Sequence, residues 1–203
     1  GYCRLTGCYM SSFWMNIRML DMHSQLTNEF RSFLMPLEFF YSKKNSSLPD
    51  ITPALDSAIP ETERSLLAHD KDMTSTLSNH HNSDLYIEVL HSEVNEDYLL
   101  RMVVLKTLSS NKPVEFGAIG IDIAKLNDEM VMELKEGFKP LGKLLEIYNV
   151  NYISNPRGYF QIKFDDYISE VLDAPLGGIS YGRCNEITDS EGFTIADIVE
   201  VLP

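Results

Sequence analysis

Two charged residues lie within otherwise apolar segments of this sequence and could do chemistry. Arg101 interrupts the run "LLRMVVL", and Glu200 interrupts "IADIVEVLP" at the C-terminal end. In an extended strand alternate residues share a face, which places each charge beside apolar side chains. Because the burial of an unpaired charge is costly, each of these residues needs a partner.

The partners of Arg101 and Glu200 can be interpreted in two ways. In the first, the two residues pair with each other, or one strand edge is solvated, and both charges belong to the scaffold. In the second, Arg101 binds a ligand carboxylate while Glu200 faces a hydroxyl or an ether oxygen. An apolar environment favours the protonated form of a carboxyl group, which suits it to proton transfer near neutral pH. We prefer the second interpretation because buried charges often mark functional sites.

The segment "KEGFKPLGKLLE", residues 135–146, interrupts a helix-forming stretch with a turn. Pro140 lies where a new helix is expected to begin, and the first backbone N–H groups of a helix have no intrahelical partners. The amides near Leu141 and Gly142 are therefore candidates to bind a carboxylate, assisted by the helix dipole. The competing interpretation is a plain helix start with Leu141 packed in the core.

Other candidate residues have simpler interpretations. Gly117 and Gly120, in "FGAIGID", lack the strand–turn–helix context of a dinucleotide-binding loop and indicate a bulge or close packing. Cys184 has no matching catalytic histidine signature and is expected to be a structural thiol. Four further basic residues could help to bind a second carboxylate, but surface charge is the preferred interpretation for Lys139, Lys143, Arg157 and Arg183.

The composition excludes several classes of partner. The 203 residues carry a formal net charge of −13, which disfavours nucleic acid and anionic membrane surfaces because both require clustered cations. Three cysteines, an odd number without a CxxC pair, fit a reducing compartment better than a disulfide framework or a zinc site. No apolar run reaches the length of a membrane span. We therefore expect a cytoplasmic protein with no metal.

The order of expected elements predicts an α+β fold. Residues 1–50 are interpreted as an N-terminal extension, helical or in part an expression remnant, and residues 51–203 as the domain. "KKNSSLPDITP" is expected to be a linker, and Asn127 and Gly137 are expected to cap and end a helix. Strand-like segments separated by short polar turns predict an antiparallel sheet with helices beside it. No internal repeat is visible.

Six motifs occur along the chain in a recognisable order. They are "DMTSTLSNH", "YLLRMVVL", "FGAIGIDIAKL", "FKPLGKLL", "SYGRCNEI" and the closing "IVEVLP". In this order and at this spacing they resemble the chorismate pyruvate-lyase family, and the match is closest to its divergent branch in mycobacteria, archaea and cyanobacteria. The resemblance covers roughly residues 55–203.

The resemblance implies a fold, a reaction and a set of site residues. The fold would be a six-stranded antiparallel sheet flanked by helices that encloses an internal ligand cavity. The reaction would be the cleavage of chorismate, a small anionic substrate, to 4-hydroxybenzoate and pyruvate without a cofactor. Arg101 and Glu200 would be catalytic, Arg101 by binding the ring carboxylate and Glu200 as general acid or hydrogen-bond partner at the para oxygen. The ligand would contact Met73, Arg101, Leu141, Gly142 and Glu200.

Two departures from the family pattern leave the substrate open. Met102 stands where the family commonly has an acid, and Ala118 stands where it has an arginine, so a reshaped pocket is expected. One alternative is a related enzyme recruited to another cyclic or enolic substrate. Another is a small-molecule-binding module without chemistry, because the same architecture resembles effector-binding domains of bacterial transcription regulators. Against the second, no helix-turn-helix is evident upstream.

Overall fold

Residues 28–203 are described by the structure, which is a computed structural model. Phe33–Pro203 form one compact unit. Much of the expected N-terminal extension, including Cys3 and Cys8, therefore lies outside the described residues.

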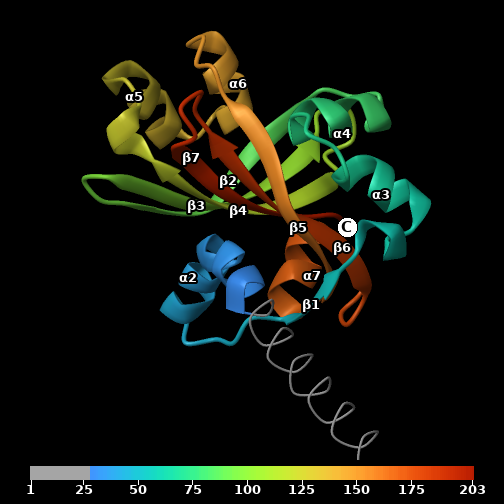
Figure 1. Ribbon diagram of the computed structural model, residues 1–203. Coiled ribbons are helices and arrows are strands. Elements are labelled where there is room, and N and C mark those ends of the chain that lie inside the picture. The colour runs from blue at the N-terminus through green and yellow to red at the C-terminus, as the bar shows by residue number, and fades with distance from the viewer. Residues whose placement is uncertain (1–27) are drawn as a thin grey trace, which may run out of the picture. The chain divides into compact units, whose positions relative to one another are not determined.

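The centre of this unit is a seven-stranded antiparallel sheet (Figure 1). Its strands lie in the order β1-β5-β6-β7-β4-β3-β2. Their bounds are β1 Asp50–Ala54, β2 Leu85–Val94, β3 Tyr98–Thr107, β4 Pro113–Asp122, β5 Ile153–Lys163, β6 Ile179–Thr188 and β7 Thr194–Val201. The predicted α+β class is confirmed, and the sheet has one strand more than the six expected.

The additional strand is β1, in a segment that the sequence predicts to be a linker. It pairs with β5 at the edge of the sheet, with Pro53 opposite Phe160. Proline cannot donate a ladder hydrogen bond and is therefore confined to edge strands and bulges, which is where Pro53 lies. The proline that argued for a linker is compatible with a strand only because the strand is at the edge.

The helices cover both faces of the sheet. Figure 1 shows α3 to α6 on one face and α2 and α7 on the other. Their bounds are α2 Met35–Lys43, α3 Glu61–Leu67, α4 Met73–His81, α5 Asp128–Glu136, α6 Leu141–Ile147 and α7 Asp166–Leu172, with short 3₁₀ turns at Asp56–Ala58 and Ile123–Lys125. The face beneath α3 to α6 is the one that carries the predicted site residues.

The ends of these helices follow local sequence signals. Asp72 caps α4, its Oδ2 accepting a hydrogen bond from the backbone N–H of Ser75 at 2.7 Å. The predicted cap of α5 is confirmed, since Asn127 Oδ1 accepts from Met130 N at 2.8 Å. Gly137 ends α5 with φ of 77°, a left-handed conformation that glycine adopts without steric strain. Asp72 thus marks the start of α4, and Pro140 marks the start of α6, which follows shortly after Gly137. Both helix starts border the candidate site.

The chain forms two units of the same topology, although no repeat is visible in the sequence. The first unit is α3-α4-β2-β3-β4 and the second is α5-α6-β5-β6-β7, with α7 inserted between β5 and β6. The last strands of the two units, β4 and β7, pair at the centre of the sheet. Positions on β3 and β6 therefore correspond to each other in the two halves of the domain.

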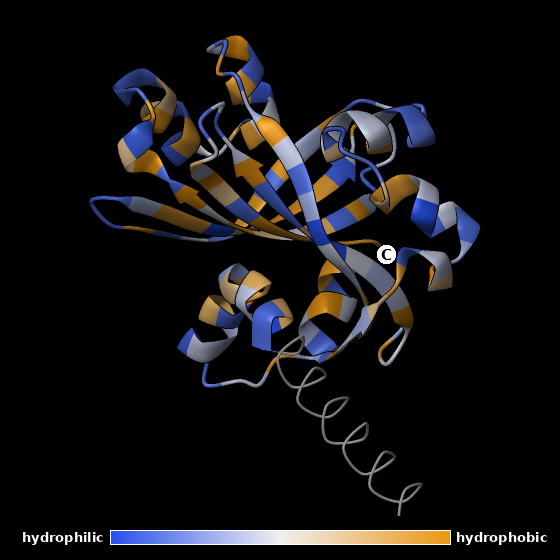
Figure 2. Ribbon diagram, in the orientation of Figure 1, coloured by the Kyte–Doolittle hydropathy of each residue, from blue (hydrophilic) through white to orange (hydrophobic). Residues whose placement is uncertain are grey.

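Two apolar clusters lie between the helices and this face of the sheet. Figure 2 shows apolar residues along the strands and in the helices that cover them. One cluster lies under α5 and α6 and includes Leu99, Ile119, Met130, Leu134, Leu141, Leu144 and Leu145. The other lies under α3 and α4 and includes Leu66, Leu67, Met73, Leu77, Leu105 and Val114. Burial of these groups holds each helix pair on the sheet.

The packing around Gly182 on β6 gives a first prediction. A Cβ added there would overlap the backbone oxygen of Glu200 and the ring of Phe160. We expect Gly182→Ala to lower the free energy of unfolding by about 3 kcal/mol, the upper part of the range for overpacked cores. Gly120→Ala is the control, because a Cβ at Gly120 would meet its nearest neighbours at 3.8–3.9 Å. Equal effects of the two substitutions in urea unfolding would contradict the tight packing at Gly182.

Candidate functional site

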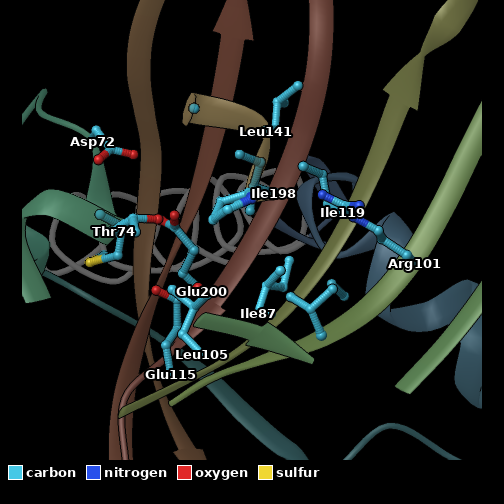
Figure 3. Close-up of a pocket in the computed structure, with 16 residues that line it drawn as sticks. Asp72, Thr74, Ile87, Arg101, Leu105, Glu115, Ile119, Leu141, Ile198 and Glu200 are labelled. Carbon is cyan, nitrogen blue, oxygen red and sulfur yellow. The ribbon is translucent and has the colours of Figure 1, made fainter. Parts of the chain in front are cut away.

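A cavity of about 70 Å³ lies between the sheet and the first residues of α4 and α6. Five predicted site residues from distant parts of the chain line this cavity, namely Met73, Arg101, Leu141, Gly142 and Glu200. Figure 3 shows Arg101 at one side of the cavity and the carboxyl groups of Asp72, Glu115 and Glu200 at the other. The fold thus brings the predicted residues together around one cavity, which has a cation on one side and acidic groups on the other.

Arg101 is the cation at one side of the cavity. Its side chain lies on β3, with the residue 2% exposed, and donates hydrogen bonds to the backbone oxygens of Leu134 at 3.2 Å and Lys139 at 3.3 Å. Its Nε is buried and has no partner. Burial lowers the pKa of Arg101 to about 10, so the guanidinium remains charged at neutral pH. Arg101 forms no ion pair with any residue in the described part of the chain.

Glu200 is paired with Arg183 and not with Arg101. The two residues are cross-strand neighbours on β7 and β6, and Arg183 Nε donates to Glu200 Oε2. Burial opposes the charge of Arg183, but the nearby Glu200 outweighs this effect and the pKa of Arg183 is raised. The predicted alternative that Arg101 and Glu200 pair with each other is therefore wrong, because strand register places a different arginine beside Glu200.

The prediction that Arg183 is a surface charge is also wrong, since the residue is fully buried. The other three basic residues considered with it are surface charges, as predicted. Lys139 pairs with Glu133, Lys143 with Glu146, and Arg157 with Glu186. In "SYGRCNEI" the flanking residues are polar or small, so the local pattern does not reveal the burial of Arg183. Its burial depends on the helices that cover β6.

The two buried arginines hold the helix connections on either side of the cavity. Arg183 donates to the backbone oxygens of Leu67 at 3.1 Å and His69 at 2.8 Å, in the connection from α3 to α4. Arg101 donates in the same way to Leu134 O in the last turns of α5 and to Lys139 O in the α5–α6 connection. Because β3 belongs to the first unit and β6 to the second, each arginine holds the helix pair of the other unit. The starts of α4 and α6 are positioned by these two residues.

Glu115 is an acid at the cavity that the sequence analysis missed. It lies on β4 opposite Leu105, is 5% exposed, and its Oε2 is buried without a partner. Burial, and then the nearby Glu200, raise the pKa of Glu115 well above its ordinary value, which favours the protonated, uncharged form of its carboxyl group. The signal was present in the sequence, because Glu115 lies between Val114 and Phe116 just as Arg101 lies between apolar neighbours.

Gly117 provides the space in which the acids approach one another. It lies on β4 opposite Glu200, and a Cβ there would be 3.3 Å from Glu115 Oε1 and 3.2 Å from Val103 Cγ2. Both distances are tighter than ordinary contacts. The prediction of close packing at this glycine is therefore confirmed, and the packing involves a site residue.

The turn at Leu141 and Gly142 contacts a carboxylate of this chain. Leu141 is buried in the cluster under α6, as the competing interpretation of the turn expects. A Cβ on Gly142 would lie 2.6 Å from Asp72 Oδ1, so the carboxylate that caps α4 lies against the start of α6. A ligand carboxylate at this turn would face Asp72, and Arg101 is therefore the better candidate to bind it.

Of the two departures from the family pattern, only Ala118 borders the cavity, and it does so through its backbone, because its side chain points to the opposite face of the sheet from its neighbours Gly117 and Ile119. Met102 pairs with Ala118 in register, but it lies at a different cavity beside Tyr41 and Tyr167 of the opposite layer. Successive side chains of a strand point to opposite faces, so Met102 and Arg101 cannot share one site. The loss of an acid at position 102 therefore does not reshape the cavity at Arg101.

A second cavity of about 40 Å³ adjoins the first and shares Met73, Leu141 and Glu200 with it. Its other polar lining includes Ser154 and Asn185, which are hydrogen-bonded to each other at 3.0 Å. A benzene-sized ligand needs a cavity of roughly 150 Å³. We therefore expect that α4 or α6 moves when a ring-sized ligand enters.

The remaining sequence predictions concern thiols, metals and membranes. Cys184 is 1% exposed and burial raises the pKa of its thiol, as expected for a structural cysteine. Within residues 28–203, no group of three or more histidine, cysteine or acidic side chains could hold a metal ion. No helix in the same range is both long and apolar enough to cross a membrane.

Comparison with known proteins identifies the fold. No family model and no curated protein matches the sequence. The effector domain of PhnF from Mycobacterium smegmatis is 10% identical with a TM-score of 0.50, over 64% of this chain and 87% of that chain. A gene product of Staphylococcus aureus is 8% identical with a TM-score of 0.50, over 68% and 90% of the two chains. A GntR-family regulator from Bacillus cereus is 11% identical with a TM-score of 0.45, over 59% and 92%.

These identities are low, so the similarity shows the fold alone. The chain shares the α+β architecture of the effector domain of PhnF. The sheet flanked by helices that the sequence predicts is thus an architecture found among known proteins.

The buried ion pair gives a second prediction. We expect Arg183→Met to lower the free energy of unfolding by about 3–5 kcal/mol, because it leaves Glu200 buried without a partner. The control is Arg157→Met, at a half-exposed residue paired with Glu186 at 3.5 Å, where a loss below about 1 kcal/mol is expected. Adding Glu200→Gln to Arg183→Met should restore part of the loss. Similar effects of the two arginine substitutions in chemical denaturation would contradict the role of the pair.

Proposed function

We propose that this domain binds a small organic carboxylate in the cavity beneath α4 and α6, as an effector-binding module. The observation that supports this most directly is Arg101, a buried guanidinium that lines the cavity, has no acidic partner in the described part of the chain, and keeps Nε unbonded. The Nε–H group is a donor that a ligand can satisfy.

The electrostatics of Arg101 favour an anion at this position. Its two hydrogen bonds go to backbone oxygens, which solvate the guanidinium but do not neutralise it. A ligand carboxylate would supply the missing charge, and charge-assisted hydrogen bonds from a guanidinium to a carboxylate are about twice as strong as neutral ones. In a protein of net charge −13, a local cation of this kind is what an anionic ligand requires.

The fold comparison supports binding more directly than catalysis. The effector domain of PhnF shares the architecture at a TM-score of 0.50. The cavity and its arginine lie between the sheet and the starts of two helices, and a concave site of this kind suits capture of a small molecule.

A third prediction tests the role of Arg101. We expect Arg101→Met to weaken the binding of 4-hydroxybenzoate, measured by calorimetry, by 10-fold to 100-fold, in line with the loss of a charge-assisted hydrogen bond worth about 1.5–3 kcal/mol. Arg157→Met is the matched control outside the cavity and should leave affinity unchanged. Equal affinity of both variants and the wild type would contradict the proposal.

The second candidate function is cleavage of chorismate. The observation that favours it is the meeting of Met73, Arg101, Leu141 and Glu200 around one cavity, since the resemblance assigns ligand contacts to these residues. In this reaction Arg101 would orient the ring carboxylate, and an acid at the far side would protonate or hydrogen-bond the ether oxygen as the C–O bond breaks. The ion pair with Arg183 suits Glu200 to accept a hydrogen bond, and the burial that raises the pKa of Glu115 suits Glu115 to donate one.

A fourth prediction separates the two candidates. If the domain is a binding module, incubation with chorismate should yield no 4-hydroxybenzoate above the uncatalysed rate when absorbance is followed over hours. Turnover that Arg101→Met reduces and Arg157→Met does not would replace the binding proposal with the lyase. Absence of turnover without binding of any aromatic acid would favour an enzyme that was recruited to another cyclic or enolic substrate.

A further inference from the structure

Two buried side-chain atoms lack hydrogen-bond partners within residues 28–203, and both belong to residues that line the same cavity. They are Arg101 Nε and Glu115 Oε2. A buried polar atom without a partner costs about 1–3 kcal/mol, and such atoms are few in native proteins. Since both atoms belong to residues that line one cavity, a ligand in that cavity could satisfy both.

The two atoms lie at opposite ends of the cavity. Arg101 is paired in register with Ile119, and Glu115 precedes Ile119 by four residues on β4, which corresponds to about 13 Å along the strand. The two side chains form no ion pair with each other. A molecule that satisfies both must therefore carry one polar group at each end.

The groups around Glu115 determine what its end of the cavity accepts. Glu200 on β7, Arg183 on β6 and Asp72 before α4 are the charged groups that act on it. Arg183 is already engaged by Glu200, so it does not balance a further negative charge. A second carboxylate on the ligand would face Asp72 and Glu200, which disfavours dicarboxylates.

We propose that Glu115 is a specificity residue which donates a hydrogen bond, as an uncharged carboxylic acid, to a neutral oxygen at the end of the ligand opposite its carboxylate. The ligand class is then a hydroxy- or keto-substituted monocarboxylic acid. This inference rests on the proposed function, since it assumes that Arg101 binds the carboxylate.

The protonation of Glu115 couples binding to pH. Burial and Glu200 raise the pKa of Glu115, so the donating form is present below that raised pKa and is lost as the pH rises through it. Affinity for such a ligand should fall over the same range. A ligand with an ammonium group at this end would show the opposite pH dependence. Its affinity would rise with pH, because the ionised carboxylate of Glu115 would bind the ammonium group best.

The test compares three probes that differ at one end, namely benzoate, 4-hydroxybenzoate and terephthalate. Their affinities for the whole chain are measured by calorimetry for the wild type, Glu115→Gln and Glu115→Leu, with folding checked by circular dichroism. We expect the wild type to bind 4-hydroxybenzoate about tenfold more tightly than benzoate, as for one hydrogen bond, and terephthalate more weakly than benzoate. Glu115→Gln, which retains a donor, should keep the preference, and Glu115→Leu should abolish it.

The pH dependence gives a readout that a merely structural role would not produce. Affinity of the wild type for 4-hydroxybenzoate should decrease with rising pH relative to its affinity for benzoate, and Glu115→Gln should show no such decrease. A preference for 4-hydroxybenzoate that survives in Glu115→Leu, or tighter binding of terephthalate than of benzoate, would overturn this inference and leave the role of Arg101 intact. Absence of Arg101-dependent binding of benzoate and 4-hydroxybenzoate would overturn the proposed function as well.

Discussion

The burial of arginine side chains on the inner strands of the sheet is the constraint on which the rest of this structure depends. Arg183 lies beneath the helices and is fully buried, and it is compensated by Glu200 and by backbone oxygens of the α3–α4 connection. Arg101 is compensated by one backbone oxygen of α5, that of Leu134, and one of the α5–α6 connection, that of Lys139. Because each guanidinium requires these acceptors, each helix connection is held at a defined position above the sheet. Because the two halves of the domain have the same topology, the arginine of each half holds the helix pair of the other half.

The polar cavity is a consequence of this arrangement. The two apolar clusters bury the helix pairs separately, and the charged residues occupy the space between them. In such a space electrostatic interactions are stronger than in water, so unpartnered groups are costly and satisfied groups are strongly favoured. Arg101 and Glu115 each retain an unpartnered atom there. Their burial is easier to understand if a ligand completes their hydrogen bonds than if the cavity has only a structural role.

The architecture is compatible with binding and with catalysis, and the difference lies at the far end of the cavity from Arg101. A lyase needs an acid there that can protonate a leaving oxygen as a bond breaks, whereas an effector domain needs only a group that recognises its ligand. Glu200 is held by Arg183, and burial raises the pKa of Glu115, which favours its uncharged form. Recognition requires no proton transfer, because an uncharged carboxylic acid can donate a hydrogen bond and keep its proton.

The sequence alone determined the fold class, the helix ends at Asn127 and Gly137, and the presence of charges at Arg101 and Glu200 within buried strands, because periodicity, capping and charges in apolar runs are local properties. It also contained the signal for Glu115, which was overlooked. Only the tertiary structure decided that Glu200 pairs with Arg183, that Met102 lies on the opposite face, and that residues 50–54 form an edge strand. These facts depend on strand order and register, which set which side chains meet across the sheet, and no single segment encodes them.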